Sequence, residues 1–449
     1  MSLLEKIGFG AGDMALNVVI STMMLLITFF YTDIYGIKVT DLAALFFAVK
    51  LIGAIGDLVM GKITDRFTTR FGRYRPYLLC LAIPYGISVF CVFTTPAWGY
   101  DAKLIWAYAT YIIMTLMTAG VGIPYISLNS ALTSDPQERL SANGYRLFFA
   151  KIGAFMVTII VPELSDYWGA GSPAAGYQAA MAVMAVMGVV LFIFCYFTTT
   201  ERVLHVVEKQ SLRNQLRVLR KNDQWLILCG VCLTGTIGYV LRGSTAVYYA
   251  KYVLGCNTTG IASFLATGVA AAILSMIAST WITKFYCKVK LFRYSQLIVF
   301  VISIVIYLGV GTGSKSGDTA MEFVLYFLLS FVVDLHAPVF WSAIAETIDY
   351  GQVKTGKRVS GLAFGGISVC QKLGMGVAGI LVGVLLSHFQ YQPNHEQSAF
   401  AMNGIALIFT VIPGFFHLLM GLLMFWYRVT DAHYIEVKNE MLQKGYVVS

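Results

Sequence analysis

Charged residues are scarce in this chain: Asp, Glu, Lys and Arg make up 12% of its 449 residues, and 58% of the residues are hydrophobic. In a soluble domain roughly a quarter of the residues are charged, so this composition excludes an ordinary soluble protein. Apolar runs of about 20 residues, the length that crosses a bilayer, recur along the whole sequence. The chain is therefore predicted to be a polytopic membrane protein.

Motifs of enzymes and pumps are also missing. The sequence shows no HExxH pair, no nucleotide-binding P-loop and no convincing nucleophile–base pair, which argues against a membrane enzyme or an ATP-driven pump. The eight cysteines are scattered, and the CxxC of Cys229 and Cys232 lies inside an apolar run, where packing as small hydrophobes is expected. We expect no enzymatic activity, no metal and no cofactor apart from a coupling ion.

The net charge of +9 does not indicate a nucleic-acid partner, because basic residues in cytoplasmic loops give membrane proteins this balance. Lys and Arg concentrate after even-numbered spans, which predicts that both termini are cytoplasmic. We expect a multi-pass protein of the plasma membrane, the inner membrane of a bacterium, with the lipid bilayer as partner.

Twelve apolar runs have the length of membrane spans. The first is expected to be a true span and not a cleaved signal peptide, because it carries Asp13 and Asn17 and lacks a small-residue cleavage site. The runs cover residues 9–33, 41–61, 77–96, 103–131, 145–163, 176–199, 225–252, 258–284, 293–313, 320–348, 359–387 and 400–427.

Residues 201–224 form the longest polar stretch and separate six spans from six. We predict an all-α membrane protein of two pseudo-symmetric six-helix bundles, with a substrate site between them. The predicted parts are an N-terminal bundle (1–200), a cytoplasmic linker (201–224), a C-terminal bundle (225–427) and a cytoplasmic tail (428–449). The protein is expected to be a monomer.

Ionisable residues interrupt the second apolar run. Lys50, Gly53 and Asp57 are spaced so that they share one face of a helix. A charge facing hydrocarbon is costly, so this face is expected to look into protein or a watery cavity.

The turn after this run, GKITDRFTTRFGRYRP, resembles the loop signature of the major facilitator superfamily. Gly61 is expected to let two helices approach closely, and the acid and the arginines of such a turn can pair with each other and with helix ends across a cytoplasmic gate. Glu346 and Asp349, beside Lys354 and Arg358, are interpreted as the gate's charge network in the second half. The first-half gate residues are Gly61, Asp65, Arg66, Arg70, Arg73 and Arg75.

Further stretches resemble the glycoside–pentoside–hexuronide:cation symporter family, which contains melibiose permease. They are KIGFGAGD (6–13), FFYTDIYG (29–36), GIPYISL (122–128), ERLSANGYR (138–146) and ETIDYGQVKTGKR (346–358). The resemblance implies a secondary active transporter of small-molecule sugars whose two bundles rock to expose the site alternately to either side.

In melibiose permease, two aspartates on the second span serve the coupling cation. The resemblance puts them at Gly53 and Asp57, so only one carboxylate is left here. One carboxylate is a poor sodium cage but an adequate proton carrier if burial raises its pKa. We therefore expect Asp57, with Lys50 near it, to couple transport to protons. Sodium coupling, uncoupled transport and a structural ion pair of Asp57 with Lys50 or Arg146 are the alternatives.

The sugar-binding aspartates of that relative fall at Asn17 and Gly122, whereas Arg146 and Lys372 match family positions at the cavity. Together with Arg242 in the seventh span, they make a cavity that should prefer an anionic sugar, a hexuronide or a sulfonated sugar. In the alternative, carboxylates such as Asp13, Asp334, Glu346 and Asp349 neutralise these cations and the substrate is a neutral glycoside.

Five further residues complete the predicted substrate site. A tyrosine or tryptophan ring can stack on a sugar, and a histidine, an amide or a hydroxyl can hydrogen-bond one. The five residues are Tyr125, His336, Trp341, Ser368 and Gln371.

The alternative function from another class is a membrane sensor that transports nothing.

Overall fold

The structure, a computed structural model, describes residues 1–66, 69–133, 136–169, 171–202, 212–311, 319–359 and 361–444. Eleven helical segments among these residues are long and apolar enough to cross a membrane, and the helix Ala82–Val92 is a shorter apolar one. The expectation of an all-α membrane protein is confirmed.

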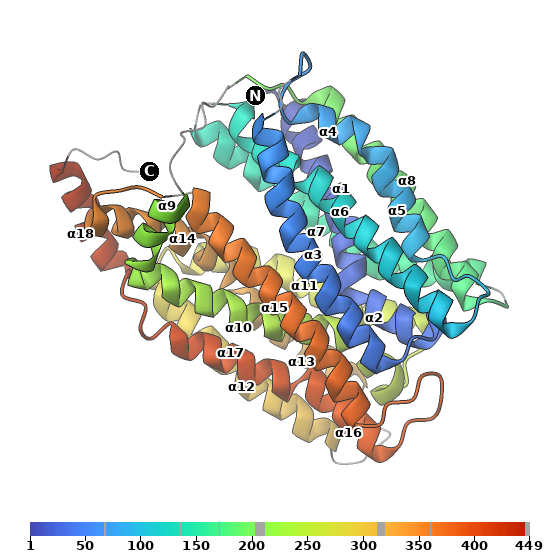
Figure 1. The fold of residues 1–449 in the computed structure, drawn as a ribbon. Coiled ribbons are helices and arrows are strands. Elements are labelled where there is room, and N and C mark those ends of the chain that lie inside the picture. The colour runs from blue at the N-terminus through green and yellow to red at the C-terminus, as the bar shows by residue number, and fades with distance from the viewer. Residues whose placement is uncertain are drawn as a thin grey trace. The chain divides into compact units, whose positions relative to one another are not determined.

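The first half of the chain contains α1 to α8 (Figure 1). A π-helix, η1, follows α1 and α2. The elements are α1 (Leu3–Leu25), α2 (Ile27–Phe29), η1 (Phe30–Tyr35), α3 (Val39–Arg66), α4 (Arg75–Cys80), α5 (Ala82–Val92), α6 (Tyr100–Leu132), α7 (Pro136–Trp168) and α8 (Pro173–Thr198).

The second half has a corresponding π-helix, η2, after its first long helix. Its elements are α9 (Leu212–Arg220), α10 (Asp223–Tyr248), η2 (Tyr249–Val253), α11 (Thr258–Ile282), α12 (Lys288–Gly311), α13 (Thr319–Asp334), α14 (Ala337–Thr355), α15 (Gly361–His388), α16 (Ala399–Phe409), α17 (Val411–Leu423) and α18 (Asp431–Gln443).

Three spans that were predicted to be continuous are interrupted near a proline, and each time the helix ends four residues before it; the first span is also divided, at Leu26, without a proline. Proline lacks the N–H that would bond to the carbonyl four residues earlier, and its ring clashes with that carbonyl. Pro124 and Pro162, by contrast, lie inside α6 and α7, so a proline interrupts a span only at some positions. The helix ends and prolines are Cys80 and Pro84, Asp334 and Pro338, and Phe409 and Pro413.

The described chain divides into two units. One consists of Met1–Val207, Ser244–Ala266 and Leu386–Gln397, and the other of Glu208–Gly243, Thr267–Leu385 and Ser398–Ser449. The first unit therefore contains two segments of the second half of the sequence. The domain boundaries predicted from the sequence stay a prediction.

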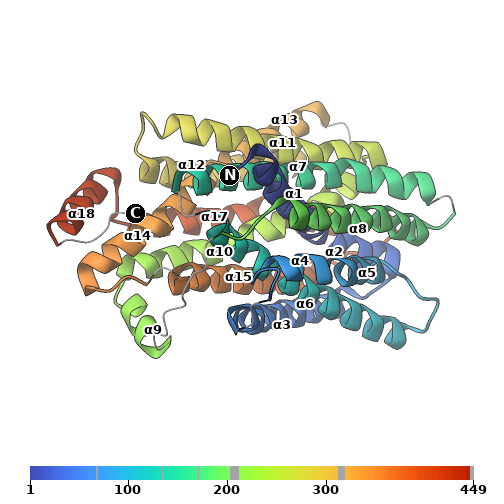
Figure 2. The ribbon, with the colours of Figure 1, turned by 90° about the horizontal axis from the view of Figure 1, so that it is seen from above.

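Glycines bring α1 and α7 close together in the first unit (Figure 2). A Cβ on Gly10 would lie 2.7 Å from Cδ2 of Phe149, and a Cβ on Gly153 would lie 3.1 Å from the carbonyl oxygen of Met14. Small residues allow such approaches between membrane helices. The GFGAG stretch of α1 thus places the polar residues that follow it against α7.

Candidate functional site

Arg146 on α7 forms an ion pair with Asp13 on α1. Nε of Arg146 lies 3.4 Å from Oδ2 of Asp13, and the two side chains are 24% and 12% exposed. Such a pair balances its own charge within the span. Arg146 is therefore neutralised by one of the carboxylates that the sequence analysis named as alternative partners.

Asn17 lies one helical turn after Asp13 on the same face of α1. Its side-chain amide donates to the main-chain carbonyl of Asp13 at 2.9 Å, and the residue is half-buried. The structure thus brings two predicted substrate residues, Asn17 and Arg146, together around Asp13.

The second span, α3, carries Lys50, Gly53 and Asp57, of which Lys50 and Asp57 are half-buried and Gly53 is buried. A Cβ on Gly53 would lie 2.7 Å from Cγ2 of Thr115 on α6, closer than real Cβ contacts come. The place where the resemblance implies a second carboxylate is therefore filled by the neighbouring helix.

Tyr125 packs α6 against α1. Its hydroxyl donates to the carbonyl of Phe9 at 2.6 Å, and its ring stacks on the Phe9 ring with centroids 5.0 Å apart. The side chain is fully buried. The structure shows a packing role for Tyr125, and its contact with a substrate stays a prediction.

In the second unit, Arg242 on α10 is buried, with 6% of the residue exposed. Among the groups that interact with it electrostatically are Tyr326, Asp334 and Tyr239. Asp334, one of the carboxylates that the sequence offers as alternative partners, thus acts on the charge of Arg242.

His336 lies at the break between α13 and α14. Its Nδ1 contacts the carbonyl of Val333, and its ring meets the Phe292 ring edge-on at 5.0 Å. Trp341, one turn into α14, is 51% exposed. The two residues lie on the same interrupted span, and their predicted contacts with a sugar stay predictions.

Ser368, Gln371 and Lys372 lie on α15, beside the seam where this helix packs on α10. Nε1 of Trp225 donates to the carbonyl of Ala363 at 3.1 Å, and a Cβ on Gly374 would lie 3.0 Å from the carbonyl oxygen of Leu233. Ala363 and Gly374 are thus among the residues at which α15 contacts α10, and contact of the three predicted residues with a substrate stays a prediction. Ser368 is exposed, and Gln371 and Lys372 are half-buried.

The predicted gate turn of the first half is fixed by a residue that the sequence analysis did not name, Glu201. Its carboxylate accepts hydrogen bonds from the main-chain N–H groups of Arg73, Tyr74 and Arg75, each at 2.8 Å. Gly72 has φ +114°, and a Cβ on it would lie 2.5 Å from Oε1 of Glu201. Glu201 therefore binds the main chain at the start of α4, and the glycine makes room for it.

The arginines of this turn differ in their surroundings. Nη2 of Arg75 donates to the carbonyl of Tyr196 at 2.7 Å, whereas Arg70 is exposed and lies over the Phe71 ring. A Cβ on Gly61 would meet no atom of the described residues within 4 Å, so among them no helix makes the close approach expected at Gly61. The side chains of Asp65 and Arg66 lie outside the described residues.

The carboxylates predicted for the second-half gate lie in α14 and are both buried. Asp349 accepts from Nη1 of Arg358 at 2.6 Å and from the Tyr434 hydroxyl at 2.7 Å. Glu346 pairs with Lys288. Arg358 is thus a partner as expected.

Lys354, expected beside these carboxylates, pairs instead with Asp223 at 2.6 Å. Lys288, the first residue of α12, is the partner of Glu346 that was not predicted from the sequence. Its place directly after the eighth span was the one signal that could have drawn attention to it.

Comparison with known proteins adds a family and a fold. A model of the family described as MFS/sugar transport protein matches residues 8–431. The chain is 31% identical to the inner membrane symporter YicJ of Escherichia coli (strain K12), over 99% of this chain and 96% of that protein. It is 32% identical to an isoprimeverose transporter of Lactiplantibacillus pentosus, over 95% of this chain and 88% of that one.

A solved structure from a study of proton-dependent oligopeptide transporters has a TM-score of 0.72 at 12% identity, and covers 97% of this chain and 99% of its own. At that identity the likeness concerns the fold alone.

Proposed function

Because the chain belongs to the MFS/sugar transport protein family, within the glycoside–pentoside–hexuronide:cation symporters, we propose that it imports a glycoside by proton symport. The two halves would expose the substrate alternately to either side of the membrane. Proton coupling is inferred from the second span, where a buried glycine, Gly53, stands in place of one of the two implied carboxylates.

Proton coupling is supported by the packing around Gly53. Thr115 fills the space that a second side chain would need, so α3 offers the single carboxylate of Asp57 at the implied cation site. A bare sodium ion needs several oxygen ligands, whereas a proton needs only one basic group, and burial can adjust the pKa of such a group.

A neutral glycoside is supported by the pairing of the basic residues. Arg146 has Asp13 at 3.4 Å, and Asp334 is among the groups that act on the charge of Arg242, so a carboxylate contributes to the surroundings of each guanidinium. The names of relatives support both candidates, since the isoprimeverose transporter is 32% identical to this chain and a glucuronide carrier protein homolog of Escherichia coli (strain K12) is 26% identical. The anionic substrate expected from charge balance is the second candidate of the test below.

Uptake into proteoliposomes tests the coupling ion. The expected result is glycoside uptake that is driven by an inward proton gradient, is abolished by a protonophore and is unaffected by a sodium gradient. The Asp57→Asn variant should lose uphill accumulation but keep exchange of glycoside. A proton symporter that lacks its proton-carrying carboxylate can still alternate between its two states with the sugar bound. Accumulation driven by sodium alone would overturn the proton proposal, and no flux of any sugar would favour a sensor.

Binding measurements test the substrate class. Neutral glycosides and hexuronides are compared by thermal shift on the wild type and on Arg242→Gln, with Arg217→Gln, an exposed arginine of α9, as matched control. If the substrate is neutral, a neutral glycoside should raise the melting temperature, and adding a hexuronide should change that rise little. Binding of hexuronides alone, lost in Arg242→Gln and kept in Arg217→Gln, would decide for the anionic candidate.

A further inference from the structure

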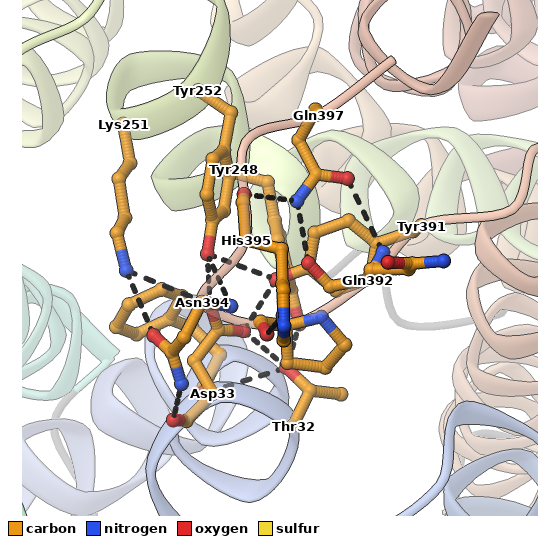
Figure 3. A network of polar contacts seen from close by, with 12 residues as sticks. Thr32, Asp33, Tyr248, Lys251, Tyr252, Tyr391, Gln392, Asn394, His395 and Gln397 are labelled. Carbon is orange, nitrogen blue, oxygen red and sulfur yellow. Dashed lines mark hydrogen bonds and ion pairs between the residues drawn. The ribbon is translucent and has the colours of Figure 1, made fainter.

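A second polar cluster lies away from these residues, at the end of the first span, and is built around Asp33 in η1 (Figure 3). The Asp33 side chain is fully buried. Its carboxylate accepts from the Tyr391 hydroxyl at 2.6 Å, from Thr32 Oγ1 at 2.7 Å and from the Tyr252 hydroxyl, and Nζ of Lys251 lies 3.6 Å away. One buried carboxylate thus gathers four donors.

Most of these donors come from the second half of the sequence, although the whole cluster lies in the first unit. Lys251 and Tyr252 belong to η2, and Tyr391 belongs to the segment between α15 and α16. Asn394 of that segment donates its side-chain amide to the main-chain carbonyl of Asp33. The cluster therefore fastens η2 and residues 386–397 to η1.

The two π-helices end in the same way. Ile37 N–H donates to the carbonyl of Tyr31 at 2.8 Å after η1, and Cys256 N–H donates to that of Ala250 at 2.9 Å after η2. A glycine with positive φ follows each, +87° at residue 36 and +67° at residue 255. π-Helices often occur at functional sites, and here equivalent ends of the two halves carry the opposite charges of Asp33 and Lys251.

A buried charge is stable only while its partners surround it, because an unsatisfied one bears the whole cost of desolvation. Burial, together with the neighbouring tyrosine and the Asp33 charge, raises the pKa of Tyr391 above its ordinary value, so its hydroxyl remains a donor. Partial separation would leave the carboxylate buried with too few donors. The cluster is therefore stable either fully assembled or fully open to water.

We propose that the Asp33 cluster (Thr32, Asp33, Tyr248, Lys251, Tyr252, Tyr391 and Asn394) is a latch that keeps the non-cytoplasmic end of the transport path closed. Tyr248 belongs to it through its hydrogen bond of 2.7 Å to Thr32. The latch must open in each transport cycle, which rests on the alternating access proposed above. Weakening the latch favours the state that is open to the outside.

Accessibility of a reporter cysteine tests the latch without any substrate. Ser244 lies on α10 one turn before Tyr248, is buried, and donates to the carbonyl of Met24 at 3.4 Å. Ser244→Cys is introduced together with Cys91→Ser and Cys256→Ser, the native thiols expected on that side, and intact cells are treated with a membrane-impermeant maleimide. Asp33→Asn should speed labelling of residue 244 at least about tenfold, since hydrogen bonds to a charged group are lost.

The matched control is Asp41→Asn. Asp41 also accepts from a tyrosine hydroxyl, that of Tyr100, on the same predicted side of the membrane, but both residues belong to the first half. It should change labelling by less than about twofold, because it fastens no segment of the second half. Equal labelling rates in Asp33→Asn and the wild type would overturn the latch, as would an equal rise in both aspartate variants.

Unfolding is separated from opening by Cys195, which is fully buried in the first unit. Mass spectrometry should find no label on Cys195 in an opened protein. If Asp33→Asn does label there, Tyr391→Phe decides: a rise at residue 244 alone supports the latch, and no rise overturns it. Because labelling needs no sugar, a wild type that transports no glycoside would contradict the proposed function and leave the labelling test valid.

Discussion

The two predicted cytoplasmic turns use their carboxylates in opposite ways. In the first half, Glu201 binds three main-chain N–H groups at the start of α4. In the second half, Asp349 binds the side chains of Arg358 and Tyr434. Main-chain donors are present whatever side chains the turn carries, whereas a side-chain donor disappears with one substitution. The first turn should therefore tolerate changes of its arginines better than loss of its distant glutamate.

Glu201→Ala should give the largest effect, because it leaves three N–H groups at a helix start without their carboxylate. We expect a loss of about 3 kcal/mol in the free energy of unfolding, after allowance for partial exposure. Thermal unfolding in detergent, followed with a thiol-reactive dye, measures it. Glu436→Ala, whose side chain is 76% exposed, is the control; equal melting of the two variants would contradict the comparison.

Asp349→Asn should have a smaller effect, about 2 kcal/mol. The Asp349 side chain is fully buried, but Arg358 is 33% exposed and can reach water when the pair is broken. A double-mutant cycle with Arg358→Met sharpens the comparison, because the double variant should be more stable than the sum of the single losses by about 1 kcal/mol. Strict additivity would show that this carboxylate, like Glu201, does not depend on one side-chain partner.

Gly72→Ala tests the same main-chain contact from the other side. Its φ of +114° disfavours a side chain, and the added Cβ would displace Glu201, so we expect a loss of about 1–2 kcal/mol. Gly61→Ala is the matched control, since a Cβ there meets no described atom within 4 Å. A larger loss in Gly61→Ala would restore the close approach that the sequence suggested for Gly61.

The spans and the family could be read from the sequence, because hydropathy and short motifs are local properties. The role of Glu201 could not be read in this way. Its partner Arg73 is 128 residues away, and main-chain N–H groups are present in every turn, so no residue type marks where they converge. The partner of Lys288 could not be predicted for a similar reason, because one basic residue after a span does not reveal which of several carboxylates it meets.

The pairing within the membrane was foreseen only as a choice. Asp13 and Asp334 stood among four carboxylates that could neutralise three cations, and charge counting alone could not match them. The glycines of α1 settle one pair, because they determine how closely α1 approaches α7 and hence that Asp13 meets Arg146. The packing of small residues thus determines which carboxylate pairs with Arg146.

The pair of Lys354 and Asp223 should show the smallest effect and gives the comparison its lower limit. Its side chains are 43% and 46% exposed, although Nζ and Oδ1 lie only 2.6 Å apart. Water and salt screen such a pair, so Asp223→Asn should cost less than about 1 kcal/mol and lose even that in molar salt. Melting curves of Asp223→Asn and Asp349→Asn at low and high salt measure the difference. A loss as large as that of Asp349→Asn would show that burial does not determine how much a carboxylate of this chain contributes to the free energy of unfolding.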